Sequence, residues 1–147
     1  MIVRGEGAYL LDQLGKRYLD GNSSIWTNIH GHGHPAIISA IQGQAATLAH
    51  SSALGFGNEP AAELAAALAG CFPKETLTKV FYTDDGSTAI ERALRLALQY
   101  WEMEGQPERA SFAAFDSAYH GDTMGAAALG GIATFHKRVS KLGMPVC

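Results

Sequence analysis

Cysteine is scarce in this sequence of 147 residues. Its two cysteines, Cys71 and Cys147, are too few for a disulfide framework or a cysteine-built zinc site, and they fit a reducing compartment. Runs of apolar residues all fall short of the roughly eighteen needed to cross a membrane. The first residues also lack the long apolar segment of a signal peptide. We therefore expect a cytoplasmic protein with no membrane contact.

Positive charge is also in short supply. Eleven lysine and arginine residues against fourteen aspartate and glutamate residues give a formal charge of −3, and no basic block stands out. This balance argues against a protein whose main partner is nucleic acid. Hydrophobic residues make up 47% and charged residues 17%, which excludes a disordered or fibrous chain. The length is enough for one domain with a core.

The residue pattern is typical of an α/β protein with a parallel sheet, because helices and strands alternate along most of the chain. The predicted strands cover residues 8–12, 17–20, 79–83 and 111–115. The predicted helices start at Pro35, at residues 58–60, just after Gly86 and at Thr123. We divide the chain into residues 1–57, a β-meander, a loop and a first helix, and residues 58–147, the start of a larger domain.

A glycine turn between a strand and a helix is the sharpest motif. In residues 83–91 the amides of Gly86, Ser87 and Thr88 open a helix and lack acceptors one turn earlier. The helix dipole adds partial positive charge, so a phosphate fits there, with the Ser87 hydroxyl as a further donor. A plain aspartate or serine helix cap is the alternative.

A second motif, residues 118–123, follows a predicted strand. In open α/β sheets the loops at the carboxyl ends of strands form the ligand crevice. Tyr119, His120 and Asp122 on this loop offer stacking and hydrogen bonds to a flat ligand. A simple turn with a buried tyrosine is the alternative.

A third segment, residues 22–35, contains three alternating histidines, His30, His32 and His34. A strand would place them on one face for a metal ion, but the intervening glycines weaken a strand and no carboxylate or cysteine completes the set. Trp26 in this loop lies either near a ligand or in a core.

Together these motifs resemble the class III, fold-type I aminotransferases that use pyridoxal phosphate. The residues that carry the likeness are Gly5–Gly7, Tyr18–Gly21, Ser23–Trp26, Ile29–Pro35, Asp85–Glu91, Ala97–Trp101 and Tyr119–Thr123. The likeness runs nearly end to end. Residues 99–101 and the pair Asp122–Thr123 favour the biotin-pathway branch over the ornithine and γ-aminobutyrate branches.

The resemblance implies the N-terminal portion of a fold-type I subunit, with pyridoxal 5'-phosphate as cofactor. It places the cofactor phosphate on Gly86 and Ser87 and the pyridine ring against Tyr119. His120 and Gly121 are then expected to shape the wall of the cofactor site.

The resemblance also implies small-molecule substrates, a homodimer and an active site shared between subunits. Trp26, Tyr119 and Asp122 are expected to contact the substrate, although Ile25 stands in the first of two adjacent positions at which a member of the family has tryptophan. The implied reaction transfers an amino group to 8-amino-7-oxononanoate and gives 7,8-diaminononanoate. S-adenosylmethionine is the expected donor, and lysine is the other donor used by related enzymes.

The family's Schiff-base lysine has no match in this sequence. Lys74, Lys79, Lys137 and Lys141 stand in other contexts, so no catalytic residue is assigned. We expect the chain to be the N-terminal part of a subunit and to be inactive alone, because transamination requires that lysine.

Three alternatives remain open at this stage. The chain could belong to another class III ω-aminotransferase, or it could be an inactive fragment or dimerisation module. Residues 84–88 also fit the phosphate loop of sugar kinases, but there the loop joins two strands, whereas a helix pattern follows here.

Overall fold

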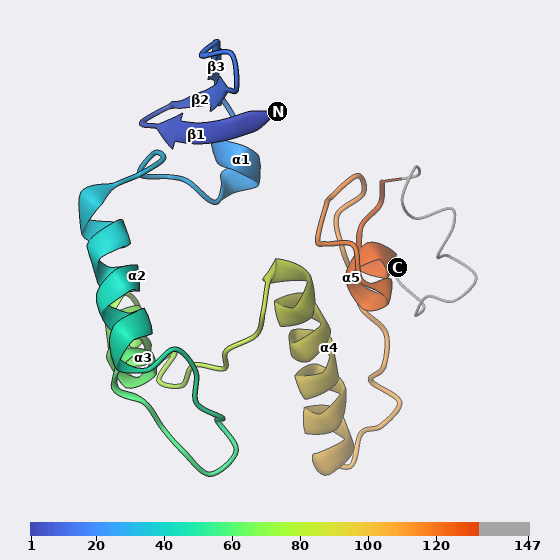
Figure 1. The fold of residues 1–147 in the computed structure, drawn as a ribbon. Helices are drawn as coiled ribbons and strands as arrows, with labels where there is room; N and C mark the ends of the chain where they lie inside the picture. The colour runs from blue at the N-terminus through green and yellow to red at the C-terminus, as the bar shows by residue number, and fades with distance from the viewer. Residues whose placement is uncertain (133–147) are drawn as a thin grey trace. The chain divides into compact units, whose positions relative to one another are not determined.

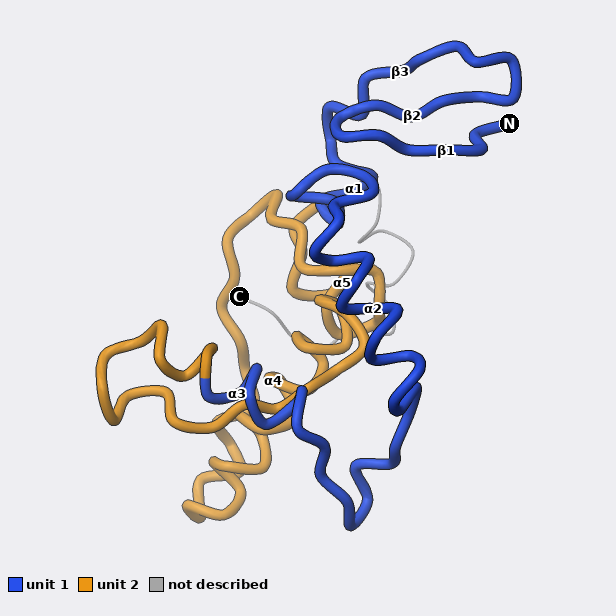
Figure 2. The backbone as a smooth tube through the Cα atoms, turned by 60° about the vertical axis from the view of Figure 1, so that its left-hand side comes forward, with its two compact units in different colours: residues 1–66 blue, residues 67–147 orange. Residues whose placement is uncertain are grey.

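The computed structural model describes residues 1–132 of the chain (Figure 1). The chain divides into two compact units, residues 1–66 and residues 67–147 (Figure 2). The first unit ends at residue 66, whereas the sequence predicts a boundary between residues 57 and 58. Among residues 1–132, no helix combines the length and the apolar character that a membrane crossing requires.

Unit 1 begins with a three-stranded antiparallel sheet in the order β1-β2-β3. The strands are β1 (Ile2–Glu6), β2 (Tyr9–Asp12) and β3 (Arg17–Leu19). The Asp12 carboxylate accepts hydrogen bonds from the amides of Leu14 (2.9 Å) and Lys16 (3.0 Å) and thereby closes the turn between β2 and β3. The predicted meander is confirmed, and β1 adds a strand that the sequence pattern did not indicate.

Two longer helices follow, α2 (Pro35–Thr47) and α3 (Glu59–Gly70), and the boundary of unit 1 falls within α3. Proline suits the first turn of α2, since its missing N–H has no acceptor there in any case. The Asn58 side chain accepts from the Ala61 amide (3.0 Å) at the start of α3. Both predicted helices are confirmed.

Unit 2 is built around α4 (Gly86–Met103) and α5 (Met124–Leu129), which pack against each other. The Glu91 carboxylate on α4 accepts from the amides of Gly125 (2.6 Å) and Ala126 (3.3 Å), so it satisfies two donors at the start of α5. Leu94 and residues 126–128 are buried beside this contact. The two predicted helices are confirmed.

The predictions of strands at residues 79–83 and 111–115 are wrong. Neither segment belongs to a strand, and only Phe112 takes part in an isolated bridge. A strand requires hydrogen bonds from a neighbouring segment, and no described segment pairs with residues 79–83. The sheet of the described residues is therefore the antiparallel meander alone.

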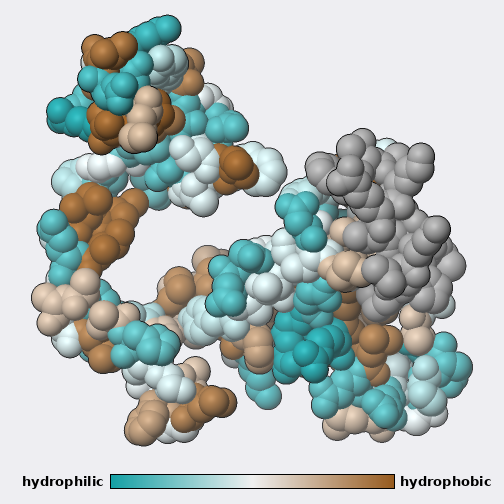
Figure 3. Space-filling view, turned by 45° about the vertical axis from the view of Figure 1, so that its right-hand side comes forward, coloured by the Kyte–Doolittle hydropathy of each residue, from teal (hydrophilic) through white to brown (hydrophobic). Residues whose placement is uncertain are grey.

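Few apolar side chains are covered in either unit. The buried hydrophobic residues of the described chain are Leu94 and three alanines of α5. Large apolar side chains lie open on both units, as the brown surfaces in Figure 3 show, and Leu14 and Phe115 are 87% and 88% exposed. Apart from the contact between α4 and α5, most large apolar side chains of the described residues are left uncovered.

Candidate functional site

The N-terminus of α4 is closed on one side by Asp85. Its carboxylate accepts from the Thr88 amide (2.8 Å), and the Thr88 hydroxyl accepts from the Asp85 amide (3.0 Å). The hydrogen bond from the Thr88 amide is the main cause that lowers the pKa of Asp85. The prediction that the Thr88 amide points outward is therefore wrong, because a capping box uses it.

The Gly86 amide and the Ser87 hydroxyl remain as donors at this helix end, because the Ser87 amide also hydrogen-bonds the Asp85 carboxylate. The Gly86 amide opens the helix and has no acceptor one turn earlier. A Cβ added at Gly86 would meet no atom within 4 Å, so open space lies beside it. The described residues thus leave this side of Gly86 uncovered.

The loop that contains the second motif crosses the same corner. The Asp122 amide donates to the Ser87 hydroxyl oxygen (3.1 Å). Gly121 lies directly on Ser87, where a Cβ would collide with the Ser87 hydroxyl, and it has a φ of +135° that favours glycine. The Ser87 oxygen accepts from Asp122, so its own proton is left to donate to another acceptor.

Tyr119 and Asp122 form a pair within this loop. The Tyr119 hydroxyl donates to the Asp122 carboxylate (2.8 Å), and this hydrogen bond raises the pKa of Tyr119. Tyr119 is 46% exposed, so the alternative of a buried tyrosine does not hold. His120 is half-buried between Tyr119 and Gly121. The structure therefore brings the predicted site residues of unit 2 to one corner.

These donors fit a phosphate ester. The corner offers an exposed glycine amide, a serine hydroxyl and the positive end of an 18-residue helix, and open space lies beside Gly86. The Asp85 carboxylate turns back to Thr88 and completes the helix cap. Donors of this kind are what a phosphate group needs, and a phosphate at this corner stays a prediction.

Trp26 belongs to unit 1 and lies in α1 (Ser23–Trp26). This short helical turn falls within the segment that the sequence predicted to be a loop. Its side chain is 71% exposed, so it is not a core residue of that unit. Ile25 beside it is 66% exposed. The turn presents two large apolar side chains to the surface.

The three histidines do not act together. The His32 ring lies 2.8 Å from the Asp20 carboxylate, while the rings of His30 and His34 are 5.8 Å apart and tilted. Within residues 1–132, no three histidine, cysteine or acidic residues gather in a way that could hold a metal ion. Sequence reasoning missed Asp20 as a partner because it precedes His32 by twelve positions.

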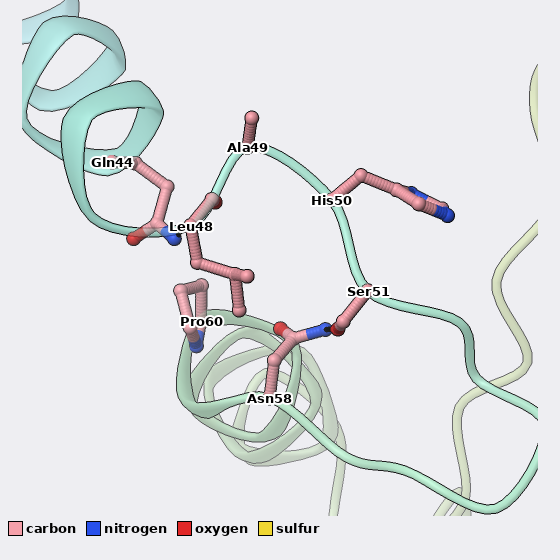
Figure 4. A pocket seen from close by; sticks show the side chains of 7 residues that line it. All are labelled: Gln44, Leu48, Ala49, His50, Ser51, Asn58 and Pro60. Atoms are coloured by element: carbon pink, nitrogen blue, oxygen red, sulfur yellow. Dashed lines mark hydrogen bonds between the residues drawn. The ribbon is translucent and has the colours of Figure 1, made fainter.

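A pocket of about 210 Å³ lies between the end of α2 and the start of α3 (Figure 4). It is lined by Gln44, Leu48, Asn58 and Pro60, among others. The side-chain amide of Gln44 donates to the Leu48 carbonyl (2.8 Å). Pockets for small molecules usually measure about 300–1,000 Å³. None of the predicted site residues lies here, and we assign it no ligand.

Comparison with known proteins defines the class. The family model described as "Aminotransferase class-III" matches residues 1–146. The chain therefore belongs to the class-III aminotransferase family.

Several relatives share one name within this family. The adenosylmethionine-8-amino-7-oxononanoate aminotransferase of Geobacter sulfurreducens is 51% identical over 136 residues, which cover 92% of this chain and 30% of the relative. That of Methanocaldococcus jannaschii is 48% identical over 136 residues, covering 92% of this chain and 29% of the relative. The chain thus spans about 30% of the length of these curated relatives.

Solved structures agree with this placement. The crystal structure of the M. jannaschii adenosylmethionine-8-amino-7-oxononanoate aminotransferase superposes with a TM-score of 0.94 and 45% identity, over 99% of this chain and 33% of that one. An amine transaminase from an uncultivated Pseudomonas species, in a PLP-bound form, superposes with a TM-score of 0.86 and 36% sequence identity. The match covers 92% of this chain and 31% of that one. The chain is therefore folded like part of a fold-type I transaminase.

Proposed function

We propose that this chain forms the cofactor-phosphate part of a pyridoxal-phosphate aminotransferase that acts on 8-amino-7-oxononanoate. The observation that carries the proposal is the meeting of Ser87, Gly121 and Asp122 at the start of α4, beside open space. The shared name of relatives about half identical to the chain supports the choice of substrate.

Each residue of the corner has a distinct task in this proposal. The Gly86 amide and the Ser87 hydroxyl bind the cofactor phosphate, and the helix dipole stabilises its charge. Gly121 lets the loop backbone lie on Ser87, and the Asp122 amide orients the Ser87 hydroxyl.

The exposed ring of Tyr119 offers an aromatic face to the pyridine ring, and half-buried His120 completes the wall of the site. Bound there, pyridoxal phosphate supplies the electron sink that amino transfer requires. The Asp122 carboxylate, held by Tyr119, attracts the substrate amine. Trp26 contributes an apolar surface to the substrate's carbon chain.

The remainder of the proposal concerns the whole protein. Its substrates are an amino donor, S-adenosylmethionine or lysine, and a keto acid, and its assembly is a homodimer with a shared site. Its location is the cytoplasm, in line with the scarcity of cysteine.

A hybrid subunit tests the proposed function directly. Residues 1–147 of this chain replace the matching N-terminal part of the M. jannaschii relative, to which they are 48% identical. We expect the hybrid to bind pyridoxal phosphate and to convert 8-amino-7-oxononanoate to 7,8-diaminononanoate with one of the two donors. The unmodified M. jannaschii relative, assayed in parallel, is the control.

The assay also separates the alternatives. A hybrid that binds the cofactor but transfers amino groups only between other amines and keto acids would identify another class III aminotransferase. A folded hybrid that binds no pyridoxal phosphate would contradict the phosphate site itself.

A further inference from the structure

The turn that presents Trp26 is held in a left-handed conformation. Ser23, Ser24, Ile25 and Trp26 have φ values of 55°, 50°, 62° and 64°. Left-handed helical backbone costs about 1–2 kcal/mol per L-residue, and a β-branched residue such as isoleucine rarely adopts it. No glycine relieves this segment, so surrounding contacts must impose the conformation.

Asp20 supplies the main contacts to this turn. Its carboxylate accepts from both the amide (2.9 Å) and the hydroxyl (2.7 Å) of Ser24. The hydrogen bonds from Ser24 and from His32 lower the pKa of Asp20, so the carboxylate is ionised at neutral pH. Charged acceptors of this kind make stronger hydrogen bonds than neutral ones.

His32 fixes Asp20 in turn. Its Nε2 lies 2.8 Å from the second Asp20 oxygen, and because that oxygen is ionised the histidine nitrogen must be the donor. The two side chains are only 14% and 6% exposed. Water therefore competes little for this contact.

The small sheet anchors His32. The amide of His32 donates to the Gly7 carbonyl (2.7 Å), and the Gly7 amide donates to the His32 carbonyl (3.1 Å). The ring lies over Gly5, where a Cβ would come within 2.6 Å of it. A continuous series of contacts thus leads from β1 through His32 and Asp20 to the left-handed turn.

We propose that Asp20 and His32 are positioning residues that hold the turn of residues 23–26, so that the apolar side chains of Ile25 and Trp26 face the substrate. This inference rests on the proposed function for its substrate. It also accounts for a histidine that binds no metal within the described residues, and for two large apolar side chains that the fold of unit 1 leaves open.

The test uses His32→Phe in the hybrid subunit, because phenylalanine keeps a ring over Gly5 but cannot donate to Asp20. We expect the KM for 8-amino-7-oxononanoate to rise about tenfold, with kcat and the affinity for pyridoxal phosphate changed less than about twofold. His32→Gln, whose side-chain amide can donate at a similar reach, is expected to restore most of the KM. The matched control is His34→Phe, since His34 makes no capping hydrogen bond and lies outside the series.

Hydrogen exchange of the peptide covering residues 22–28 provides a readout independent of substrate. The amides of Trp26 and Thr27 donate to Asn22 and Ser23 within the turn, and we expect both to exchange faster in His32→Phe. Unchanged exchange would overturn the proposed series of contacts whatever the enzyme's substrate is.

Faster exchange with an unchanged KM, or an equal fall in kcat and cofactor affinity, would overturn the positioning role. If the unsubstituted hybrid transfers amino groups to a different acceptor, the same comparison of KM values applies to that acceptor. In that case the named substrate fails and the positioning role is still tested.

Discussion

Gly121 is the residue on which the candidate site depends most. Its backbone lies against Ser87 with no room for a side chain, at a φ that glycine alone tolerates well. The neighbouring Asp122 amide reaches the Ser87 hydroxyl only because of this close approach. At this scale the phosphate site is a backbone arrangement that one methyl group would disturb.

Gly121→Ala tests that arrangement. The added methyl collides with Ser87 and strains the backbone by about 1–3 kcal/mol, so we expect pyridoxal phosphate to bind the hybrid subunit at least about tenfold more weakly in equilibrium titration. Gly43→Ala is the matched control, because a Cβ there meets no atom within 4 Å and alanine favours a helix. Equal cofactor affinity in both variants would contradict the close approach.

The ionised Asp20 carboxylate predicts a pH dependence of stability. The pKa of Asp20 in the folded chain is below the ordinary value of 3.8. Its contribution to the free energy of unfolding is therefore complete above pH 3.8 and is lost as the pH falls through the lowered pKa. We expect acidification to lower the midpoint temperature of thermal unfolding more in the hybrid subunit than in its Asp20→Asn variant. Parallel curves for the two proteins would show that the carboxylate does not hold the turn.

Among the elements, α5 depends on α4 for its start. Thr123 and the amides of Gly125 and Ala126 surround the Glu91 carboxylate and lower its pKa. Gly125 has no room for a side chain, because a Cβ would come within 2.6 Å of that carboxylate. This contact fixes α5, and hence the loop that crosses Ser87, to the helix that carries Ser87.

Glu91→Ala removes the carboxylate that accepts from these two amides within the described residues. An unsatisfied buried donor costs about 1–3 kcal/mol, so we expect amide exchange in the peptide covering residues 123–130 to rise by about tenfold or more in the hybrid. Glu91→Gln keeps one acceptor oxygen, and its effect is expected to be smaller. Exchange that stays at the original rate in Glu91→Ala would refute the link between the helices.

Local signals in the sequence predicted the helices well. Pro35, Asn58 and Gly86 mark helix starts by chemistry that acts within one turn. The strands at residues 79–83 and 111–115 failed because pairing depends on a distant partner that local pattern does not specify.

The candidate site was predicted in part. Ser87 and the loop of residues 119–122 carry recognisable motifs, and the structure brings them together. The aspartate cap, which the sequence left open as the alternative to a phosphate site, is present, because the Asp85 carboxylate accepts from the Thr88 amide. The left-handed turn at residues 23–26 was missed, because nothing in Ser-Ser-Ile-Trp favours positive φ.

Across residues 1–132, few large side chains are buried. Trp26, Phe56, Phe81 and Phe115 are each at least 60% exposed. Large apolar side chains exposed to this extent are unusual in a protein that exists as a monomer.

We therefore expect the 147-residue chain, expressed alone, to associate or aggregate in sedimentation velocity at micromolar concentrations. In the hybrid subunit the same faces gain partners, and we expect discrete dimers. A compact monomer of the isolated chain would contradict the exposure of these faces.

The central claim is that Ser87, at the start of α4, binds the phosphate of pyridoxal phosphate. The most direct test measures the dissociation constant of pyridoxal phosphate for the hybrid subunit and for its variants Ser87→Ala, Ser87→Thr and Ser52→Ala. Ser52 is the control, because its hydroxyl also accepts a hydrogen bond from a backbone amide, that of Leu54. The account predicts a loss of about tenfold or more for Ser87→Ala, since a hydrogen bond to a charged group is worth about 1.5–3 kcal/mol. It predicts near-original affinity for Ser87→Thr and Ser52→Ala, whereas an unchanged affinity in Ser87→Ala would contradict it.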